Sequence, residues 1–374
     1  MMYRITTLLV AALFSLLASA QTLNVQVGDV IYQVPASKAG DMLFNEGESI
    51  TIMDKVYELN SISQMYVGDT SVADSTVSVV YDGASAQVFV AGNVARYLTV
   101  GITGAHVSIA QSDDLPFEIT YTLSGSSDDG EFYMSGSYKA TVSLSGLTLT
   151  NPNGAPINIQ NGKRIQISAK RDTENTLTDG SNGNQKGCIY SKGQIQLQGN
   201  GTLTVYGNTA HAIKSGDYIS MKNLTLNILS AAKDGISCNE YFLMKSGTLN
   251  IITADDDGIQ VELKGDTPTA ATADHDDENT GNFYMEDGVL SILQCGGKVI
   301  KADGSVNFTG GSQDFDKDAV MEYAATGISS IKVEGLGAKA IYDLNGRQLP
   351  AGKSLSRGLY IIRNGKEVKK AVIR

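Results

Sequence analysis

The sequence lacks several features that mark common classes of protein. It has no tryptophan, 6 prolines, 3 cysteines and 3 histidines in 374 residues. So few cysteines predict free thiols rather than a disulfide scaffold, and histidines without shared spacing argue against a zinc site. The net charge of −11 argues against a nucleic-acid partner. Beyond the N-terminal segment, no apolar run is long enough to span a membrane.

What the chain does contain is a repeat. Asp234-Gly235-Ile236 recurs 23 residues later as Asp257-Gly258-Ile259, and His211-Ala212-Ile213 stands 23 residues upstream. Lys298-Val299-Ile300 follows after 41 residues, which is one period plus an 18-residue insertion. Short alternating apolar runs and glycine turns fill each period. This pattern predicts a solenoid of stacked β-coils.

The phase of the repeat predicts which residues become neighbours. Strands in adjacent coils should lie about 4.8 Å apart, so residues one period apart should lie side by side. One position of the repeat is apolar in every coil and should stack inward: Ile195, Ile219, Phe242, Phe283 and Val306. Cys238 falls in another inward row, where it is expected to fill the core.

Changes in pattern divide the chain into four parts. Residues 1–20 are predicted to be a secretory signal peptide, with Arg4, the apolar run Ile5–Leu17 and small residues before Gln21. Residues 21–70 are expected to form an N-terminal β region that caps the first coil, and 71–325 the β-helix. Residues 326–374 carry ten Lys/Arg against three Asp/Glu, which indicates a separate module.

Asn175–Gly180, Gly201–Val205 and the two Asp-Gly-Ile strings resemble a bacterial family of secreted carbohydrate-binding proteins. The resemblance covers roughly residues 75–323. It implies an all-β, right-handed parallel β-helix like that of pectate lyases, calcium on the coil turns, and binding of cellulose-like or pectin-like polysaccharide. His211-Ala212 and Lys298-Val299 stand where the family would have Asp-Gly, so the number of calcium sites stays open.

The tail has a resemblance of its own. Ile341–Arg347, followed by Gly358–Ile362 and a basic end, is similar to the C-terminal sorting domain of type IX secretion substrates. The resemblance implies a small β-sandwich-like module, passage across an outer membrane and attachment at the cell surface. Secreted or cell-surface localisation is therefore expected, and the oligomeric state is left open.

The turn carboxylates are the strongest candidates for a metal site. Asp234 and Asp257 share a phase, and two close carboxylates repel unless a cation or proton intervenes. Calcium accepts six to eight oxygens and suits such a turn. The alternative is pairing with Lys233 and Lys298. Glu240 shares a second, weaker ladder with Asp217, for which two solvated carboxylates are the favoured interpretation. The predicted calcium ligands are Asp234, Asp255, Asp256, Asp257 and Glu240.

Tyrosines suggest a surface for sugar rings. Tyr218 and Tyr241 share an outward phase and Tyr284 lies in the next coil, so the three could form a strip on which sugars stack. The alternative is ordinary cross-strand packing. Lys214 and Lys233 complete the predicted carbohydrate-binding set.

We therefore predict calcium-dependent binding of an extracellular polysaccharide, without an assigned catalytic residue. One alternative is a calcium-dependent polysaccharide lyase, for which Lys214, Lys233, Lys245 or Lys301 would be the base. Another is a structural or adhesive surface protein whose aspartates only rigidify the turns. The acidic insertion, centred on Asp274–Glu278, is expected to be either a loop on the working face or a solvated, flexible loop.

Overall fold

The structure is a computed structural model that describes residues 21–316, 320–322, 339–343, 347–349, 358–364 and 367–373. The chain divides into two units, Met1–Glu322 and Tyr323–Arg374. In the described ranges the regular elements are strands and three short 3-10 segments, and no helix there is long and apolar enough to cross a membrane. The predicted signal peptide, residues 1–20, lies outside the described residues.

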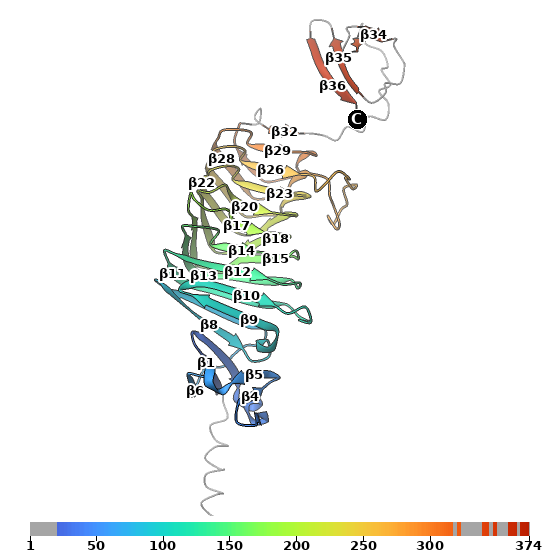
Figure 1. Ribbon diagram of the computed structural model, residues 1–374. Coiled ribbons are helices and arrows are strands. Elements are labelled where there is room, and N and C mark those ends of the chain that lie inside the picture. The colour runs from blue at the N-terminus through green and yellow to red at the C-terminus, as the bar shows by residue number, and fades with distance from the viewer. Residues whose placement is uncertain are drawn as a thin grey trace, which may run out of the picture. The chain divides into compact units, whose positions relative to one another are not determined.

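One wall of the first unit is a ten-stranded sheet whose strands are stacked like rungs (Figure 1). Apart from the β9–β10 hairpin at its start, neighbouring strands pair in parallel. In spatial order the strands are β9 (Leu98–Thr103), β10 (Ala105–Gln111), β12 (Gly130–Ser135), β14 (Ile157–Ile159), β17 (Gly187–Ser191), β20 (His211–Ser215), β23 (Ile236–Asn239), β26 (Ile259–Glu262), β29 (Ile300–Ala302) and β32 (Val320–Glu322).

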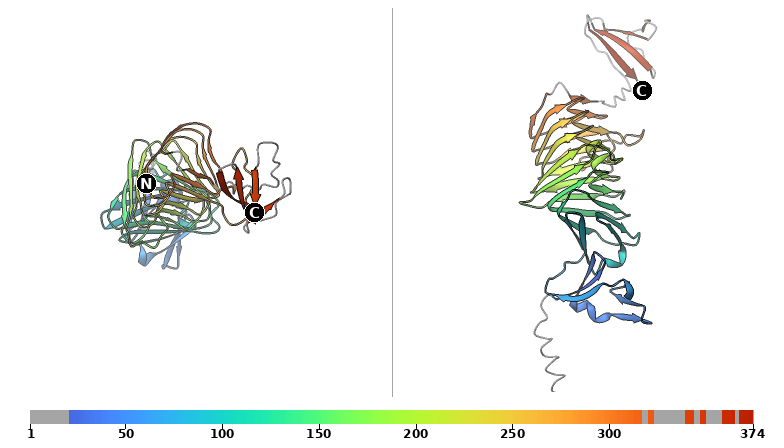
Figure 2. Two further views of the ribbon diagram at one scale, coloured as in Figure 1. Left: turned by 90° about the horizontal axis from the view of Figure 1, so that it is seen from above. Right: turned by 60° about the vertical axis from the view of Figure 1, so that its left-hand side comes forward.

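Two further parallel stacks complete each coil, as Figure 2 shows from the side. The first contains β15 (Ile165–Ala169), β18 (Ile195–Gly199), β21 (Ile219–Lys222), β24 (Tyr241–Met244), β27 (Asn282–Met285) and β30 (Val306–Phe308). The second contains β16 (Glu174–Asp179), β19 (Thr202–Gly207), β22 (Thr225–Ala231), β25 (Thr248–Ala254), β28 (Val289–Cys295) and β31 (Ser312–Asp314). The long strand β13 (Ala140–Asn151) starts both stacks, since its first half pairs with β15 and its second half with β16. These long parallel sheets make the unit an all-β solenoid.

The strand register confirms the predicted neighbours. Ile213 pairs with Ile236, which pairs with Ile259, and the next rung pairs Ile259 with Ile300 across the insertion. The predicted apolar row is continuous from Ile195 to Val306. Within it the rings of Phe242 and Phe283 stack at 5.2 Å, a contact worth about 0.5–1.5 kcal/mol beyond its buried area.

The cysteines also behave as expected. Cys238 is fully buried in its inward row, and Cys188 is buried as well. Cys188, Cys238 and Cys295 are all free thiols.

The start of the solenoid differs from the prediction. Strands expected in residues 21–70 are present as β1 (Thr22–Val27), β2 (Val30–Pro35), β4 (Ser49–Ile52) and β6 (Gln64–Gly68), with β3 (Leu43–Asn45) and β5 (Lys55–Glu58) in addition. The segment expected to form early, less regular coils contains two antiparallel hairpins, β7 (Thr76–Asp82) with β8 (Ser85–Ala91) and β9 with β10. Gly83 and Gly104 provide the positive φ values, +60° and +62°, on which these tight turns depend. β2 and β8 pair in parallel, and the continuous parallel stacks start where β11 (Ile119–Ser127) pairs with β7 and β12 pairs with β10.

The second unit contains an antiparallel sheet. Its described strands are β33 (Lys339–Tyr342), β34 (Gln348–Leu349), β35 (Gly358–Asn364) and β36 (Glu367–Ile373). In the described part of this unit these strands form one antiparallel sheet.

Candidate functional site

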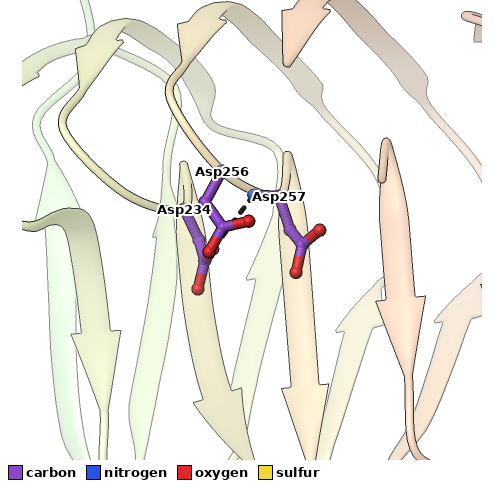
Figure 3. A group of neighbouring side chains, drawn as sticks. All are labelled: Asp234, Asp256 and Asp257. Atoms are coloured by element: carbon purple, nitrogen blue, oxygen red, sulfur yellow. Dashed lines mark hydrogen bonds between the residues drawn. The ribbon is translucent and has the colours of Figure 1, made fainter. Parts of the chain in front are cut away.

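Three aspartates gather at the turns that lead into the ten-stranded sheet. Asp234 precedes β23, and Asp256 and Asp257 precede β26 in the next coil, so parallel pairing brings them together (Figure 3). One carboxylate oxygen from each lies within 4.8 Å of the others. The backbone N–H of Asp257 donates to Asp234 Oδ1 at 3.1 Å, which ties the two turns. Two oxygens on opposite sides of a calcium ion would also be about 4.8 Å apart.

Asp257 is neutralised, although not by the predicted side chains. Its Oδ1 accepts the backbone N–H of Lys298 at 2.7 Å, and its Oδ2 accepts Lys301 Nζ at 2.9 Å. The hydrogen bond to Asp257 raises the pKa of Lys301 above its ordinary value. Lys301 therefore forms the ion pair that the alternative interpretation assigned to Lys233 and Lys298.

Asp234 is the unsatisfied member of the cluster. Its side chain is 1% exposed, and Oδ2 makes no hydrogen bond. Oδ2 lies 3.1 Å from His211 Nδ1, within ion-pair distance, but without the geometry of a hydrogen bond, and that nitrogen is also without a hydrogen-bond partner. An unsatisfied buried polar group costs about 1–3 kcal/mol, more when it is charged, so this oxygen has unused capacity for a cation.

The backbone at Gly297 lies against the carboxylates of Asp256 and Asp257. A Cβ at Gly297 would lie 2.3 Å from Asp257 Oδ1 and 2.8 Å from Asp256 Oδ1. Only glycine permits this approach, which leaves the carboxylate oxygens directly beneath a backbone segment.

The structure separates Asp255 and Glu240 from this three-aspartate cluster. Asp255 is exposed, and Glu240 lies at the opposite end of β23. There Lys264 Nζ donates to Glu240 Oε1 at 3.1 Å and to Asp217 Oδ1. Burial, together with the nearby Asp217, raises the pKa of Glu240. The expectation of two solvated carboxylates is wrong, because a lysine from the insertion bridges them and Asp217 is buried.

The predicted tyrosine strip is present but partly covered. Tyr218 and Tyr241 stack at 4.7 Å with an angle of 12° between their rings. Tyr241 is only 5% exposed, because His275 from the insertion lies 5.5 Å from its ring. His275 also packs on Tyr284, at 4.5 Å. The expected outward exposure of Tyr241 is therefore wrong, whereas Tyr218 and Tyr284 are half-buried.

The insertion combines a solvent-exposed stretch, residues 264–274, with a hydrogen-bonded segment that packs on the coils, His275–Thr280. Asn279 ties its two ends, accepting the N–H of Lys264 at 2.8 Å and donating to the carbonyls of Lys264 and Thr267. Glu278, 2% exposed, accepts from Thr280 and Tyr284 at 2.5 Å and lies 2.7 Å from His275 Nδ1. Burial disfavours the charge on Glu278, yet these hydrogen bonds lower its pKa below the ordinary value.

A cavity of about 340 Å³ lies between the insertion and the tyrosine pair. We call it the insertion cavity. Its lining combines aromatic faces with carboxylates and amides: Gln194, Tyr218, Glu240, Tyr241, His275, Asp276, Asp277, Glu278 and Asn279. An aromatic wall with a few convergent polar groups is typical of sites for small polar ligands such as sugars.

The two predicted lysines lie elsewhere. Lys233 is exposed at the turn beside the aspartate cluster. Lys214 stands on β20, where Nζ donates to Ser237 Oγ at 3.0 Å and to Asn239 Oδ1 at 3.2 Å. Neither lysine lines the insertion cavity.

Comparison with known proteins places this chain in a family. A family model described as "Carbohydrate-binding domain-containing protein" matches residues 103–351, which is more than half of the chain. The chain belongs to this family of carbohydrate-binding domain-containing proteins.

Two relatives show how far the likeness extends. A protein of Acetivibrio thermocellus with the same description is 32% identical over an alignment of 103 residues, and the match covers 25% of this chain and 36% of that protein. The chain thus spans about a third of that relative's length. Among solved structures, the gadolinium derivative of the polysaccharide lyase-like protein from C. thermocellum has a TM-score of 0.51 and 22% identity, covering 67% of this chain and 98% of that one. At that identity the likeness shows the fold alone.

Replacement of the bridging lysine, Lys264→Met, should loosen the insertion. Asp217 and Glu240 would then repel each other without a cation between them. We expect a protease that cuts after acidic residues to cleave within residues 266–278 several times faster than in the unmodified protein. The matched control is Lys245→Met, an exposed lysine at the end of β24. Equal cleavage of the two variants would contradict the bridging role.

Proposed function

We propose that the protein binds an extracellular polysaccharide with the help of calcium, and that the insertion cavity holds a sugar ring. The stacked pair Tyr218 and Tyr241, which lines a cavity together with His275–Asn279 of the insertion, is the observation that carries this proposal. A half-buried tyrosine face covers the apolar C–H surface of a sugar, while carboxylates and amides around it accept and donate hydrogen bonds to hydroxyls. Membership of the carbohydrate-binding family supports the same conclusion.

The charge of the insertion cavity favours a neutral glycan. Four of its lining residues are carboxylic acids, namely Glu240, Asp276, Asp277 and Glu278. Like charges at short range repel, so a uronate would be disfavoured there. Of the two predicted glycan classes, a cellulose-like chain therefore fits this cavity better than polygalacturonate.

The aspartate cluster fits calcium. All its side-chain donors are carboxylate oxygens, the ligand type that calcium prefers, and Asp234 Oδ2 is buried without a hydrogen bond. Asp234, Asp256 and Asp257 would hold the ion, which would balance the negative charge that Lys301 leaves on the cluster and fix the two turns beside the ten-stranded sheet.

We also propose that the coils are right-handed, that residues 1–20 direct export, and that residues 326–374 attach the protein to the cell surface. The sequence resemblances support these assignments. N-terminal sequencing of protein released from cells should begin at Gln21, and deletion of residues 326–374 should release the protein into the medium. An intact N-terminus in the released protein, or unchanged surface retention after the deletion, would contradict the assignment concerned.

Loss of the tyrosine face should weaken glycan binding. We expect Tyr218→Ala to reduce affinity for cello-oligosaccharides about threefold to tenfold, the value of one aromatic contact. Calorimetric titration of Tyr218→Ala measures this loss. Tyr206→Ala, a half-buried tyrosine on β19, is the matched control and should bind normally. If the unmodified protein bound neither cello-oligosaccharides nor polygalacturonate, the proposed function would be refuted.

Calcium should stabilise the protein through the aspartate cluster. At a calcium concentration 100 times Kd, linkage adds about 2.7 kcal/mol to the unfolding free energy and raises Tm by a few degrees. We expect Asp256→Asn to abolish most of this rise, because it removes one charged ligand. Asp255→Asn, a neighbouring exposed aspartate outside the cluster, should retain the full rise. Measurement of Tm against calcium concentration for these two variants tests whether the aspartate cluster binds the ion.

A further inference from the structure

The outer face of the ten-stranded sheet carries a row of polar and aromatic side chains unrelated to the insertion cavity. Strand pairing places one residue of each successive strand in this outer row: Ser108, Tyr133, Asn158, Tyr190, Lys214, Ser237, Gln260 and Lys301. Asn158 and Ser237 are buried beneath their neighbours, and the other six are exposed or half-buried. None of them lines the insertion cavity.

The tyrosines of this row point outward. Tyr133 lies between buried Phe132 and Met134 on β12, and is itself partly exposed, as the alternation of a strand requires. Tyr190 is likewise partly exposed between two buried residues on β17. The two tyrosines are two strands apart, about 9.6 Å along the stack.

Hydrogen bonds hold the polar members in place. Asn158, between the two tyrosines, donates to Glu131 Oε1 at 2.8 Å and accepts from Gln160 Nε2 at 2.7 Å. Lys214, next to Tyr190, is bound to Ser237 and Asn239. Groups fixed in this way bind a ligand without a large loss of side-chain entropy.

A cavity of about 300 Å³ lies at the β10 end of the row. Its lining includes Tyr133 with Ser108, His106 and Glu131. His106 Nε2 lies 3.0 Å from Asp129 Oδ1, so polar groups also surround this tyrosine. An aromatic ring, a carboxylate and an imidazole around a concave surface provide both the apolar face and the hydrogen-bonding groups that a sugar ring needs.

We infer that the outer row is a second saccharide-binding site, which holds a stretch of neutral glycan chain along the solenoid axis. In an extended β-1,4-linked chain every second ring presents the same face, and Tyr133 and Tyr190 are likewise two strands apart. The cations of the row are already compensated, Lys214 by Glu262 at 3.8 Å and Lys301 by Asp257 at 2.9 Å. A neutral chain therefore suits the row better than a uronate.

This inference rests on the proposed function, since both sites would take the same polysaccharide. Two sites on one protein have a measurable consequence. A chain long enough to occupy both would bind more tightly than a short oligosaccharide that occupies one, through effective concentration rather than new contacts.

The test is calorimetric titration with cellohexaose and affinity electrophoresis in hydroxyethylcellulose. We expect two equivalents of cellohexaose in the unmodified protein and one in the double variant Tyr133→Ala/Tyr190→Ala. In the gel the double variant should be retarded at least fivefold less. Tyr206→Ala is the matched control. Tyr133→Leu/Tyr190→Leu, which keeps an apolar cover on the sheet but no planar ring, should lose binding in the same way, so that a folding defect of the alanine variant does not decide the result.

Each outcome separates this inference from the proposed function. Unchanged stoichiometry and retardation in both double variants would overturn the second site, while a loss in Tyr218→Ala would still support the insertion cavity. Absence of any binding by the unmodified protein would overturn both.

Discussion

Parallel pairing at a fixed period is the constraint on which the rest of this structure depends. It places each residue beside its equivalent in the next coil, about 4.8 Å away. Apolar residues gain from this arrangement, as in the ring stack of Phe242 and Phe283. Acidic residues one period apart repel each other, so each acidic pair needs a positive charge of its own to balance it.

The compensation differs along the solenoid and creates the candidate cation site. Lys264 bridges Asp217 and Glu240, and Lys301 binds Asp257. Asp234 has a buried oxygen without a hydrogen bond, next to two further carboxylates. The proposed cation site is therefore the place where the side chains of the protein leave repeated negative charge only partly balanced.

The periodic part of the fold could be predicted from sequence, because pairing in register follows directly from the spacing of Ile213, Ile236 and Ile259. The opening hairpins could not, since Thr76–Gln111 has no repeat from which to read a register. The contacts of the insertion were also beyond prediction. The only signal for Lys264, His275 and Glu278 was the acidity of the segment, whereas their partners are set by how the insertion folds back over the coils.

The central claim is that aspartates one period apart form a single cation site. Anomalous diffraction from crystals soaked in a lanthanide substitute for calcium, such as gadolinium, tests it most directly. The account predicts a strong peak within bonding distance of carboxylate oxygens of Asp234, Asp256 and Asp257. A map in which these aspartates face different sides of the molecule, or in which the strong peaks lie only elsewhere, would contradict it.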